Sequence, residues 1–158
     1  RYGKEYAIVF CDVDNFKHYN DRNGHPAGDE LLKEVAKVMM KCVRNTDLPA
    51  RYGGEEFVVL CPEVNWKDSL VLAERIRTTL CEGKFAHSEA QPLGYLSVSI
   101  GVASFPADGK TVEEVLHAAD QALYVSKKSG RNRVTPHQSL QEKKMKIVSP
   151  PPFKPKAS

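Results

Sequence analysis

The sequence contains no apolar run longer than the six residues from Tyr6 to Cys11. A helix that crosses a bilayer needs about 20 such residues, and no secretory segment opens the chain, so nothing argues for export. The four cysteines lie 31, 19 and 20 residues apart and form no CxxC pair, which leaves a zinc or redox site without local support. We therefore expect reduced core cysteines in a cytoplasmic protein.

Two common nucleotide-binding loops, GxxxxGK[ST] and GxGxxG, are also missing. The net charge of +3 could suggest nucleic-acid binding, but residues 136–158 carry five lysines and one glutamate. That tail contributes +4, so residues 1–135 carry a net charge of −1. A protein that grips a phosphate backbone needs a basic face on its folded body, so we expect no nucleic-acid partner.

The length of 158 residues suits one folded domain, and 41% apolar with 27% charged residues is typical of a globular protein. Five of the ten prolines lie in the last 23 residues, beside lysine and few large apolar groups. We therefore expect a domain over residues 1–135 and a disordered Pro/Lys-rich tail over residues 136–158.

Hydrophobic periodicity predicts six elements within residues 1–135. They are a buried strand over 6–11, an amphipathic helix over 31–42, a hairpin of 50–52 and 57–61, a helix over 72–80, a half-buried strand over 96–102, and a helix over 112–123. Asn65 and Thr111 are the expected helix caps, and Gly53-Gly54 is the expected two-residue hairpin turn. The order strand, helix, hairpin, helix, strand, helix implies an α+β domain with helices packed on a sheet.

Acidic residues gather where these elements end. Asp12 and Asp14 follow the first strand, and Glu55 and Glu56 stand at the hairpin tip. Carboxylates delivered to one edge of a sheet suit Mg²⁺, which takes oxygen ligands and usually only one or two protein carboxylates. The alternative is that Asp14 caps the next helix and that the glutamates form a solvated turn.

Four motifs in a fixed order favour the metal site over the cap and the solvated turn. Gly53-Gly54 removes side chains from the turn, so phosphates could approach its backbone closely. The stretch RYGGEEF over 51–57 resembles the signature of the GGDEF family, with Glu in the third place. The family's other motifs match DVDNFKHYND over 12–21 with Gly24-His25 and Gly28-Asp29, then SIGVA over 99–103, and finally ADQALY over 119–124 with Lys127 and GRNR over 130–133.

The resemblance implies a diguanylate cyclase, which condenses two GTP molecules into cyclic di-GMP and two pyrophosphates with Mg²⁺, or Mn²⁺ in its place. It also implies a nucleotide-cyclase-like α+β fold, with a central mixed or antiparallel sheet and a ferredoxin-like core surrounded by helices. One chain cannot close the product ring alone, so a homodimer is expected for catalysis. Relatives carry an upstream sensory or dimerising domain and often belong to multidomain or membrane-anchored signalling proteins.

Residue roles carry over position by position from the resemblance. The implied metal ligands are the carboxylates of Asp12 and Glu55 and the backbone carbonyl of Val13. Glu56 is implied as a second catalytic acid, for metal binding or for deprotonation of the 3′-OH. The implied substrate-binding residues are Asn20 and Asp29 for guanine, and Gly53, Gly54, Lys17, Lys127 and Arg131 for the phosphates. Guanine presents N–H donors that a carboxylate can accept, and adenine has no matching donors.

Four residues near these motifs receive plainer interpretations. Asp14 is interpreted as a cap or as an acid that supports the ligands, rather than as a ligand itself. His25, beside Pro26, is interpreted as a structural loop histidine, and Lys128 as solvated. Tyr124 lies on the apolar face of its predicted helix and is interpreted as core.

Arg44-Asn-Thr-Asp47 resembles the family's RxxD site, which binds the product and inhibits the enzyme; the alternative is a surface ion pair. Relatives usually carry a DxLTGLxNR segment before the first strand, which is missing from this sequence. We therefore expect the sequence to be part of a longer protein. The main alternative function is a catalytically silent GGDEF domain that binds GTP or cyclic di-GMP as a signalling module.

Overall fold

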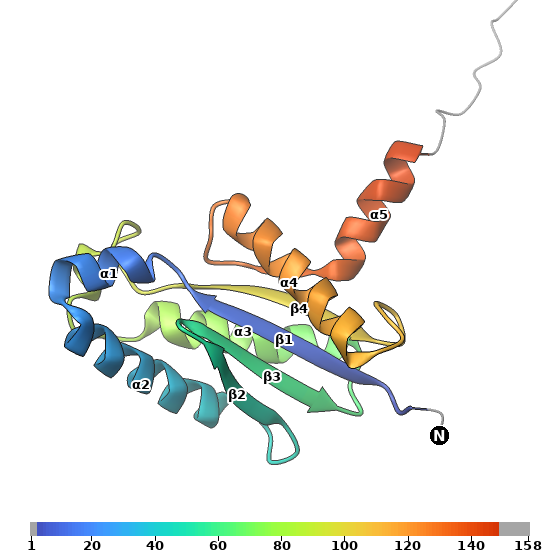
Figure 1. The fold of residues 1–158 in the computed structure, drawn as a ribbon, viewed down its shortest axis with the longest axis horizontal. Helices are drawn as coiled ribbons and strands as arrows, with labels where there is room; N and C mark the ends of the chain where they lie inside the picture. The colour runs from blue at the N-terminus through green and yellow to red at the C-terminus, as the bar shows by residue number, and fades with distance from the viewer. Residues whose placement is uncertain (1–2, 149–158) are drawn as a thin grey trace, which may run out of the picture.

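The computed structural model describes residues 3–148 of the chain (Figure 1). These residues form five strands, five α-helices and one short 3₁₀ helix at Ser88–Ala90. In chain order they are β1 (Tyr6–Val13), α1 (Phe16–Asn23), α2 (His25–Cys42), β2 (Leu48–Gly53), β3 (Glu56–Pro62), α3 (Trp66–Glu82), β4 (Val98–Phe105), α4 (Val112–Lys128), β5 (Val134–Pro136) and α5 (His137–Val148).

The strands form one mixed sheet in the order β2-β3-β1-β4-β5. Strand β1 pairs antiparallel with both β3 and β4, β2 pairs antiparallel with β3, and β5 is parallel to β4. The connection β1-α2-β2-β3-α3-β4 with this strand order is the ferredoxin-like arrangement. The predicted α+β fold with a ferredoxin-like core is therefore confirmed.

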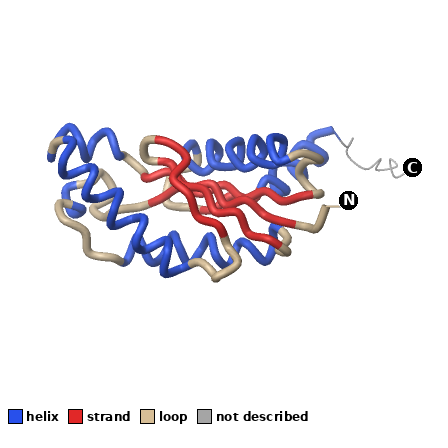
Figure 2. The backbone as a smooth tube through the Cα atoms, turned by 60° about the horizontal axis from the view of Figure 1, so that its bottom comes forward, coloured by secondary structure: helices blue, strands red, loops and turns tan. Residues whose placement is uncertain are grey.

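Helices cover both faces of the sheet, as Figure 2 shows. Alternate β1 residues such as Val9 and Cys11 pack with α2 and α3 in one buried cluster, because successive side chains of a strand point to opposite faces. Ile8 and Phe10 belong to the second cluster, against Val115 and Leu123 of α4. The sheet therefore lies between two apolar layers, and the polar ends of its strands are left at the edges.

The structure corrects two details of the predicted strands. Gly53 pairs with Glu56, so the two-residue hairpin loop is Gly54-Glu55, one position later than expected. Strand β4 was expected to be half-buried, but all its residues except Phe105 are buried. Its small residues Ser99 and Gly101 face inward as well, because α4 covers that side of the strand.

Residues 137–148 differ from the expected disordered tail, since they form α5, which extends away from the sheet in Figure 1. Its first turn is held to the domain: His137 Nδ1 lies 2.8 Å from Asp108 Oδ1, and Gln138 Nε2 donates to the same oxygen at 2.8 Å. The proline-rich residues 149–158 lie outside the described part of the chain. None of the described helices is both long and apolar enough to cross a bilayer.

Candidate active site

The carboxyl end of β1 lies against the tip of the β2–β3 hairpin. The backbone N–H of Val13 donates to the carbonyl of Glu55 at 3.1 Å, and Asp12 pairs with Glu56 in the strand register. Asp12 is only 5% exposed, although its side chain is charged. The edge predicted from the sequence is thus formed, with the strand end and the hairpin acids side by side.

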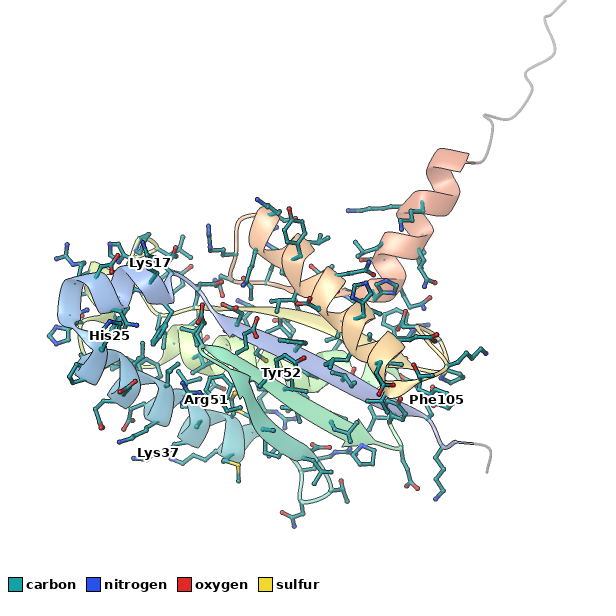
Figure 3. All side chains as sticks on the ribbon, viewed as in Figure 1. Lys17, His25, Lys37, Arg51, Tyr52 and Phe105 are labelled. Atoms are coloured by element: carbon teal, nitrogen blue, oxygen red, sulfur yellow. The ribbon has the colours of Figure 1, made fainter. Side chains whose placement is uncertain are left out.

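A cleft of about 260 Å³ opens at this edge. Its lining comes from the β1–α1 junction, the hairpin tip and the C-terminal end of α4 with the loop that follows: Asp12, Val13, Asp14, Asn15, Phe16, Lys17, His18, Glu55, Lys127 and Arg131. The cleft therefore contains all three predicted metal ligands and all three predicted phosphate-binding cations. Figure 3 shows Lys17 at the start of α1, and Arg51 and Tyr52 on the hairpin.

Asp12 is paired with Lys127, whose Nζ lies 2.6 Å from Asp12 Oδ2. Burial raises the pKa of Asp12 to about 6; Lys127 opposes this rise, and the nearby Glu55 and Glu56 add to it. The negative form of Asp12 is thus disfavoured by burial and by two like charges. A cation that enters the cleft would relieve both effects.

Glu56 lies outside this cleft. It lines a neighbouring cavity of about 390 Å³ on the α4 side of the sheet, together with residues that include Tyr52 and Asp120. Burial raises the pKa of Glu56, Lys127 opposes the rise, and Asp120 and Glu55 add to it. The structure therefore separates the two glutamates of the signature: Glu55 faces the cleft, and Glu56 stands beside Asp12 on the adjoining surface.

The residues of the cleft fit a hard divalent cation that is shared with a substrate. Among the described side chains, no three His, Cys, Asp or Glu residues converge closely enough to hold a metal alone. Mg²⁺ is usually bound by one or two carboxylates plus substrate phosphates and water. The carboxylates of Asp12 and Glu55 and the Val13 carbonyl provide this kind of incomplete oxygen set.

The three cationic residues predicted to bind phosphate differ in exposure and in their contacts with the protein. Lys17 is 93% exposed, and its nearest acid, Asp21, is 3.8 Å away. Lys127 is half-buried against Asp12. Arg131 follows α4 in a backbone conformation with φ of +63°. Because all three line one cleft with Glu55, a polyphosphate could meet cations from two sides of the sheet edge.

The predicted guanine readers lie on two adjacent helices, Asn20 on α1 and Asp29 on α2. The Asn20 side chain lies directly against Gly28 of α2. Only glycine fits at position 28, since a Cβ there would overlap Asn20 Oδ1. That oxygen is buried and accepts no hydrogen bond from any residue that the structure describes. A buried acceptor without a donor is unfavourable, so the position suits a ligand with an N–H group.

Asp29 lines a separate hollow of about 480 Å³ between α2 and the hairpin. Its walls are mainly apolar, with Leu32, Ala36, Met39, Met40, Pro49, Ala50 and Phe57, and with Lys33 and Arg51 at its charged positions. Asp29 and the predicted metal ligands therefore line two different hollows. An apolar hollow with few polar groups suits a flat base.

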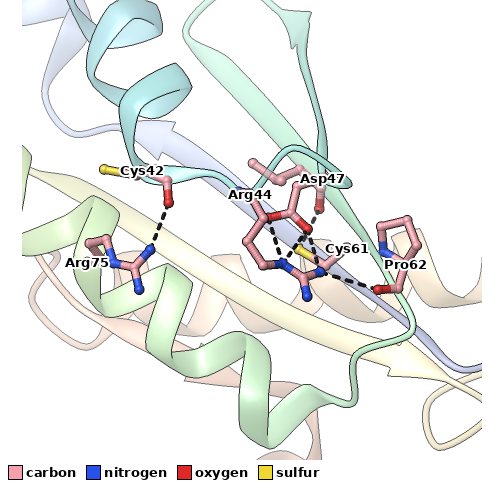
Figure 4. Close-up of polar contacts among 7 residues, drawn as sticks. Cys42, Arg44, Asp47, Cys61, Pro62 and Arg75 are labelled. Atoms are coloured by element: carbon pink, nitrogen blue, oxygen red, sulfur yellow. Dashed lines mark hydrogen bonds and ion pairs between the residues drawn. The ribbon is translucent and has the colours of Figure 1, made fainter.

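Arg44 and Asp47 form a closed pair between α2 and β2 (Figure 4). Arg44 Nη2 and Nε donate to Asp47 Oδ1 at 2.7 and 3.1 Å, and the Arg44 backbone N–H donates to Asp47 Oδ2 at 2.8 Å. Burial favours the neutral form of Asp47, but these bonds from Arg44 outweigh it and lower the pKa of Asp47. The pair lines a hollow of about 280 Å³ that also includes Arg75.

The plainer interpretations had mixed outcomes. Asp14 is not a helix cap: Asn15 precedes α1, and the Asp14 carboxylate binds elsewhere in the fold. His25 is the first residue of α2 and does not line the cleft. Tyr124 was expected in the core but is 60% exposed, with Lys128 Nζ 5.4 Å from its ring.

The hydrogen-bond partners of Asp14 were not predicted from the sequence. Ser97 and Ser99 Oγ donate to it at 2.7 and 2.6 Å, and the Asn132 backbone N–H donates at 3.0 Å. Both serines lie within the segment 96–102, for which the sequence predicts a half-buried strand. An acid beside a strand end and serines at alternating positions of another strand could have indicated such a buried network.

The family model described as "Diguanylate cyclase, GGDEF domain" matches residues 1–133. The chain belongs to the GGDEF family. It is 43% identical over 129 residues to diguanylate cyclase A of Treponema denticola, covering 82% of this chain and 34% of that protein. The chain thus spans only about a third of the length of this relative, and 29% of response regulator PleD of Caulobacter vibrioides.

Solved structures show the same GGDEF fold. The GGDEF domain of DgcB from Caulobacter crescentus in complex with c-di-GMP superposes with a TM-score of 0.76 at 35% identity, covering 85% of this chain and 78% of that one. The active GGEEF domain of a diguanylate cyclase from Vibrio cholerae gives 0.75 at 30% identity, covering 85% and 83%. The predicted fold class is confirmed by both.

Proposed function

We propose that this GGDEF domain is the catalytic unit of a diguanylate cyclase, which condenses two GTP molecules into cyclic di-GMP and two pyrophosphates. The observation that carries the proposal is the composition of the cleft at the sheet edge. It combines two carboxylates and a carbonyl suited to Mg²⁺ with three cations suited to a triphosphate. Family membership provides the matching chemistry.

In this proposal, Lys17, Lys127 and Arg131 bind the triphosphate and stabilise the charge that develops as pyrophosphate leaves. Mg²⁺, or Mn²⁺, held by Asp12, Glu55 and the Val13 carbonyl would neutralise charge on the phosphoryl oxygens. The side-chain-free turn at Gly53 and Gly54 lets phosphates come near the hairpin. Glu56, beside Asp12, either supports metal binding or accepts the 3′-OH proton.

Guanine is read by Asn20 and Asp29. The buried Asn20 Oδ1 accepts no hydrogen bond within residues 3–148, and Asp29 provides a carboxylate in the lining of the mainly apolar hollow. Guanine N1–H and N2–H₂ can satisfy such acceptors, whereas adenine presents no equivalent pair of donors. A site whose buried polar groups stay unpaired with the wrong base discriminates strongly.

Catalysis requires a homodimer in which two clefts face each other. Each cleft holds one GTP, and each 3′-OH attacks the α-phosphate of the other nucleotide. We further propose that the domain works in the cytoplasm, where GTP is available, under a sensory or dimerising domain of the same protein. Its matched relatives are about three times as long as the matched segment, which is consistent with additional domains.

The test is incubation with GTP and Mg²⁺, with detection of cyclic di-GMP by mass spectrometry. A version that includes the preceding DxLTGLxNR segment should be assayed beside the 158-residue chain, since that segment belongs to the family's pattern. Formation of cyclic di-GMP that stops with EDTA supports the proposal. Binding of GTP without any product in either version would instead support the silent-module alternative.

The base assignment has its own test, Asp29→Ser. Loss of the carboxylate should reduce discrimination between GTP and ATP by about ten- to a hundredfold, since hydrogen bonds to charged groups contribute about 1.5–3 kcal/mol. The matched control is Glu30→Gln, which removes an exposed acid paired with Lys33 on the same helix. Full guanine selectivity in the Asp29 variant would contradict the assignment.

A further inference from the structure

Asp14 is a buried acid that the proposed chemistry does not use. Asp14 is only 3% exposed, and both of its carboxylate oxygens accept hydrogen bonds. Oδ1 accepts from Ser99 Oγ, and Oδ2 accepts from Ser97 Oγ and from the backbone N–H of Asn132. Three donors from two other parts of the chain thus converge on one side chain. Asp14 lines the same cleft as Glu55, but both of its carboxylate oxygens are engaged by protein donors.

The donor at Asn132 belongs to a loop with an unusual backbone. Three successive residues have positive φ: Gly130 at +114°, Arg131 at +63° and Asn132 at +45°. This left-handed region is unfavourable for residues with a side chain and persists where surrounding contacts impose it. Those contacts are present here, because the Arg131 N–H donates to Ser126 O at 3.1 Å and the Asn132 N–H donates to Asp14.

The Asn132 side chain is held as well. Its Nδ2 donates to Tyr95 Oη at 3.1 Å, and Arg77 Nη1 donates to its Oδ1 at 3.0 Å. Asn132 is therefore fixed by Asp14 just after β1, by Arg77 of α3 and by Tyr95 before β4. The residue just before it, Arg131, is one of the three cations that line the cleft.

We propose that Asp14 is a positioning residue, which holds the 130–132 loop in its left-handed conformation and so directs Arg131 to the nucleotide phosphates. The phosphate part rests on the proposed function. Asp14 extends from the same strand end as Asp12, so one short segment would carry a metal ligand and fix the phosphate-binding loop opposite it. Its two serine bonds keep the carboxylate in place and share its charge.

Equilibrium binding of 3′-deoxy-GTP with Mg²⁺ tests this, since that analogue lacks the attacking hydroxyl. Asp14→Ala and Arg131→Ala should each weaken binding about tenfold or more, as expected for a lost charge-assisted phosphate contact. The double variant should bind no more weakly than Arg131→Ala, because Asp14 acts through Arg131. Additive losses would overturn the proposal.

Asp14→Asn separates positioning from metal binding. The amide has the same shape: its oxygen can accept from Asn132 and Ser97, and its NH₂ can donate to Ser99 Oγ. It should therefore bind the analogue within about twofold of wild type. A loss as large as that of Asp14→Ala would show that the charge matters, as in a metal ligand, and would overturn the proposal.

Hydrogen exchange at the Asn132 amide gives a readout that needs no nucleotide. Asp14→Ala should remove its protection, and Asp14→Asn should keep it. If the alanine variant does not fold, Asp14→Ser replaces it, since its shorter side chain cannot reach the Asn132 N–H. Unchanged protection overturns the proposal even if the wild type binds no GTP analogue, an outcome that by itself would contradict only the proposed function.

Discussion

Two buried aspartates in this domain each face one cation, yet their pKa values shift in opposite directions. Burial raises the pKa of Asp12 to about 6 in spite of Lys127, whereas the pKa of Asp47 is lowered because bonds from Arg44 outweigh its burial. The number of donors explains the difference. Asp47 accepts from two guanidinium nitrogens and a backbone N–H of Arg44, whereas Asp12 is paired with one ammonium group and lies near two further acids.

The comparison distinguishes a satisfied acid from an unsatisfied one. Asp47 is paired by its own four-residue turn, which leaves the Arg44 side chain 51% exposed and able to meet an anion. Asp12 stays in a negative environment that one lysine does not neutralise, which favours the entry of a further cation. The two acid–base pairs thus differ in what is left over: at Asp12 it is negative charge, and at Asp47 it is the exposed part of the Arg44 guanidinium.

The largest expected effect comes from removing the unsatisfied acids. Asp12→Asn and Glu55→Gln should each reduce Mg²⁺-dependent formation of cyclic di-GMP by about 100-fold or more, because a metal provides several kcal/mol of charge stabilisation. Circular dichroism should show an intact fold. The matched control is Glu34→Gln, an exposed acid on α2 paired with Lys37. Near-normal turnover by a folded Asp12 or Glu55 variant would contradict the assignment of that residue as a metal ligand.

The second prediction concerns stability against pH, measured by urea unfolding without Mg²⁺. Folding raises the pKa of Asp12 from 3.8 to about 6, so the stability linked to its protonated form is present below pH 3.8 and lost as pH rises through about 6. Relative to Asp12→Asn, wild type should therefore lose about 2–3 kcal/mol between pH 4 and pH 7.

Asp47 should behave with the opposite sign. Folding lowers its pKa from 3.8, so its contribution is present above that pH and is lost as pH falls through the folded value. The stability difference between wild type and Asp47→Asn should accordingly stay flat from pH 5 to pH 7. Parallel pH profiles for the two variants would show that the two acids do not differ as described.

The sequence predicted the features of the fold that depend on a single helix or strand. The apolar run before Asp12 identified a buried strand, and both helix caps are confirmed: Asn65 accepts from the Asp68 N–H at 2.8 Å, and Thr111 from the Glu114 N–H at 3.2 Å. Periodicity also located α2, α3 and α4. Caps and periodicity are local properties of the chain, and for this reason a single sequence reveals them.

What the sequence did not reveal depends on how elements cover one another. Alternation in β4 suggested a polar outer face, but α4 lies on that face and buries Ser99. Tyr124 lies on α4 at an apolar position in the pattern, yet it is exposed. The separation of Glu55 from Glu56, and the capture of Asn132 by Asp14, likewise arise from tertiary packing. Periodicity shows which residues are apolar and does not show what lies opposite them.

The smallest expected effect tests the anion site. We propose that cyclic di-GMP binds at Arg44 and Asp47 and inhibits the enzyme without competing at the GTP site. The segment lies directly before β2, whose hairpin carries Glu55, so a bound product could restrain the hairpin or bridge two subunits so that their clefts cannot meet. Coupling between two such sites is typically about 1–3 kcal/mol, or about 5- to 150-fold in affinity.

Arg44→Ala should relieve this inhibition and leave the initial rate nearly unchanged, because it deletes the guanidinium that a phosphate would bind in bidentate fashion. The measurement is initial velocity against added cyclic di-GMP in an active version of the protein. Lys41→Ala removes an exposed cation three residues earlier and should leave inhibition as in wild type. If Arg44→Ala and wild type are inhibited at the same product concentration, the Arg44–Asp47 pair is only a structural ion pair and does not bind the product. The contrast with Asp12 would then concern acidity alone, because the exposed guanidinium would have no anion to bind.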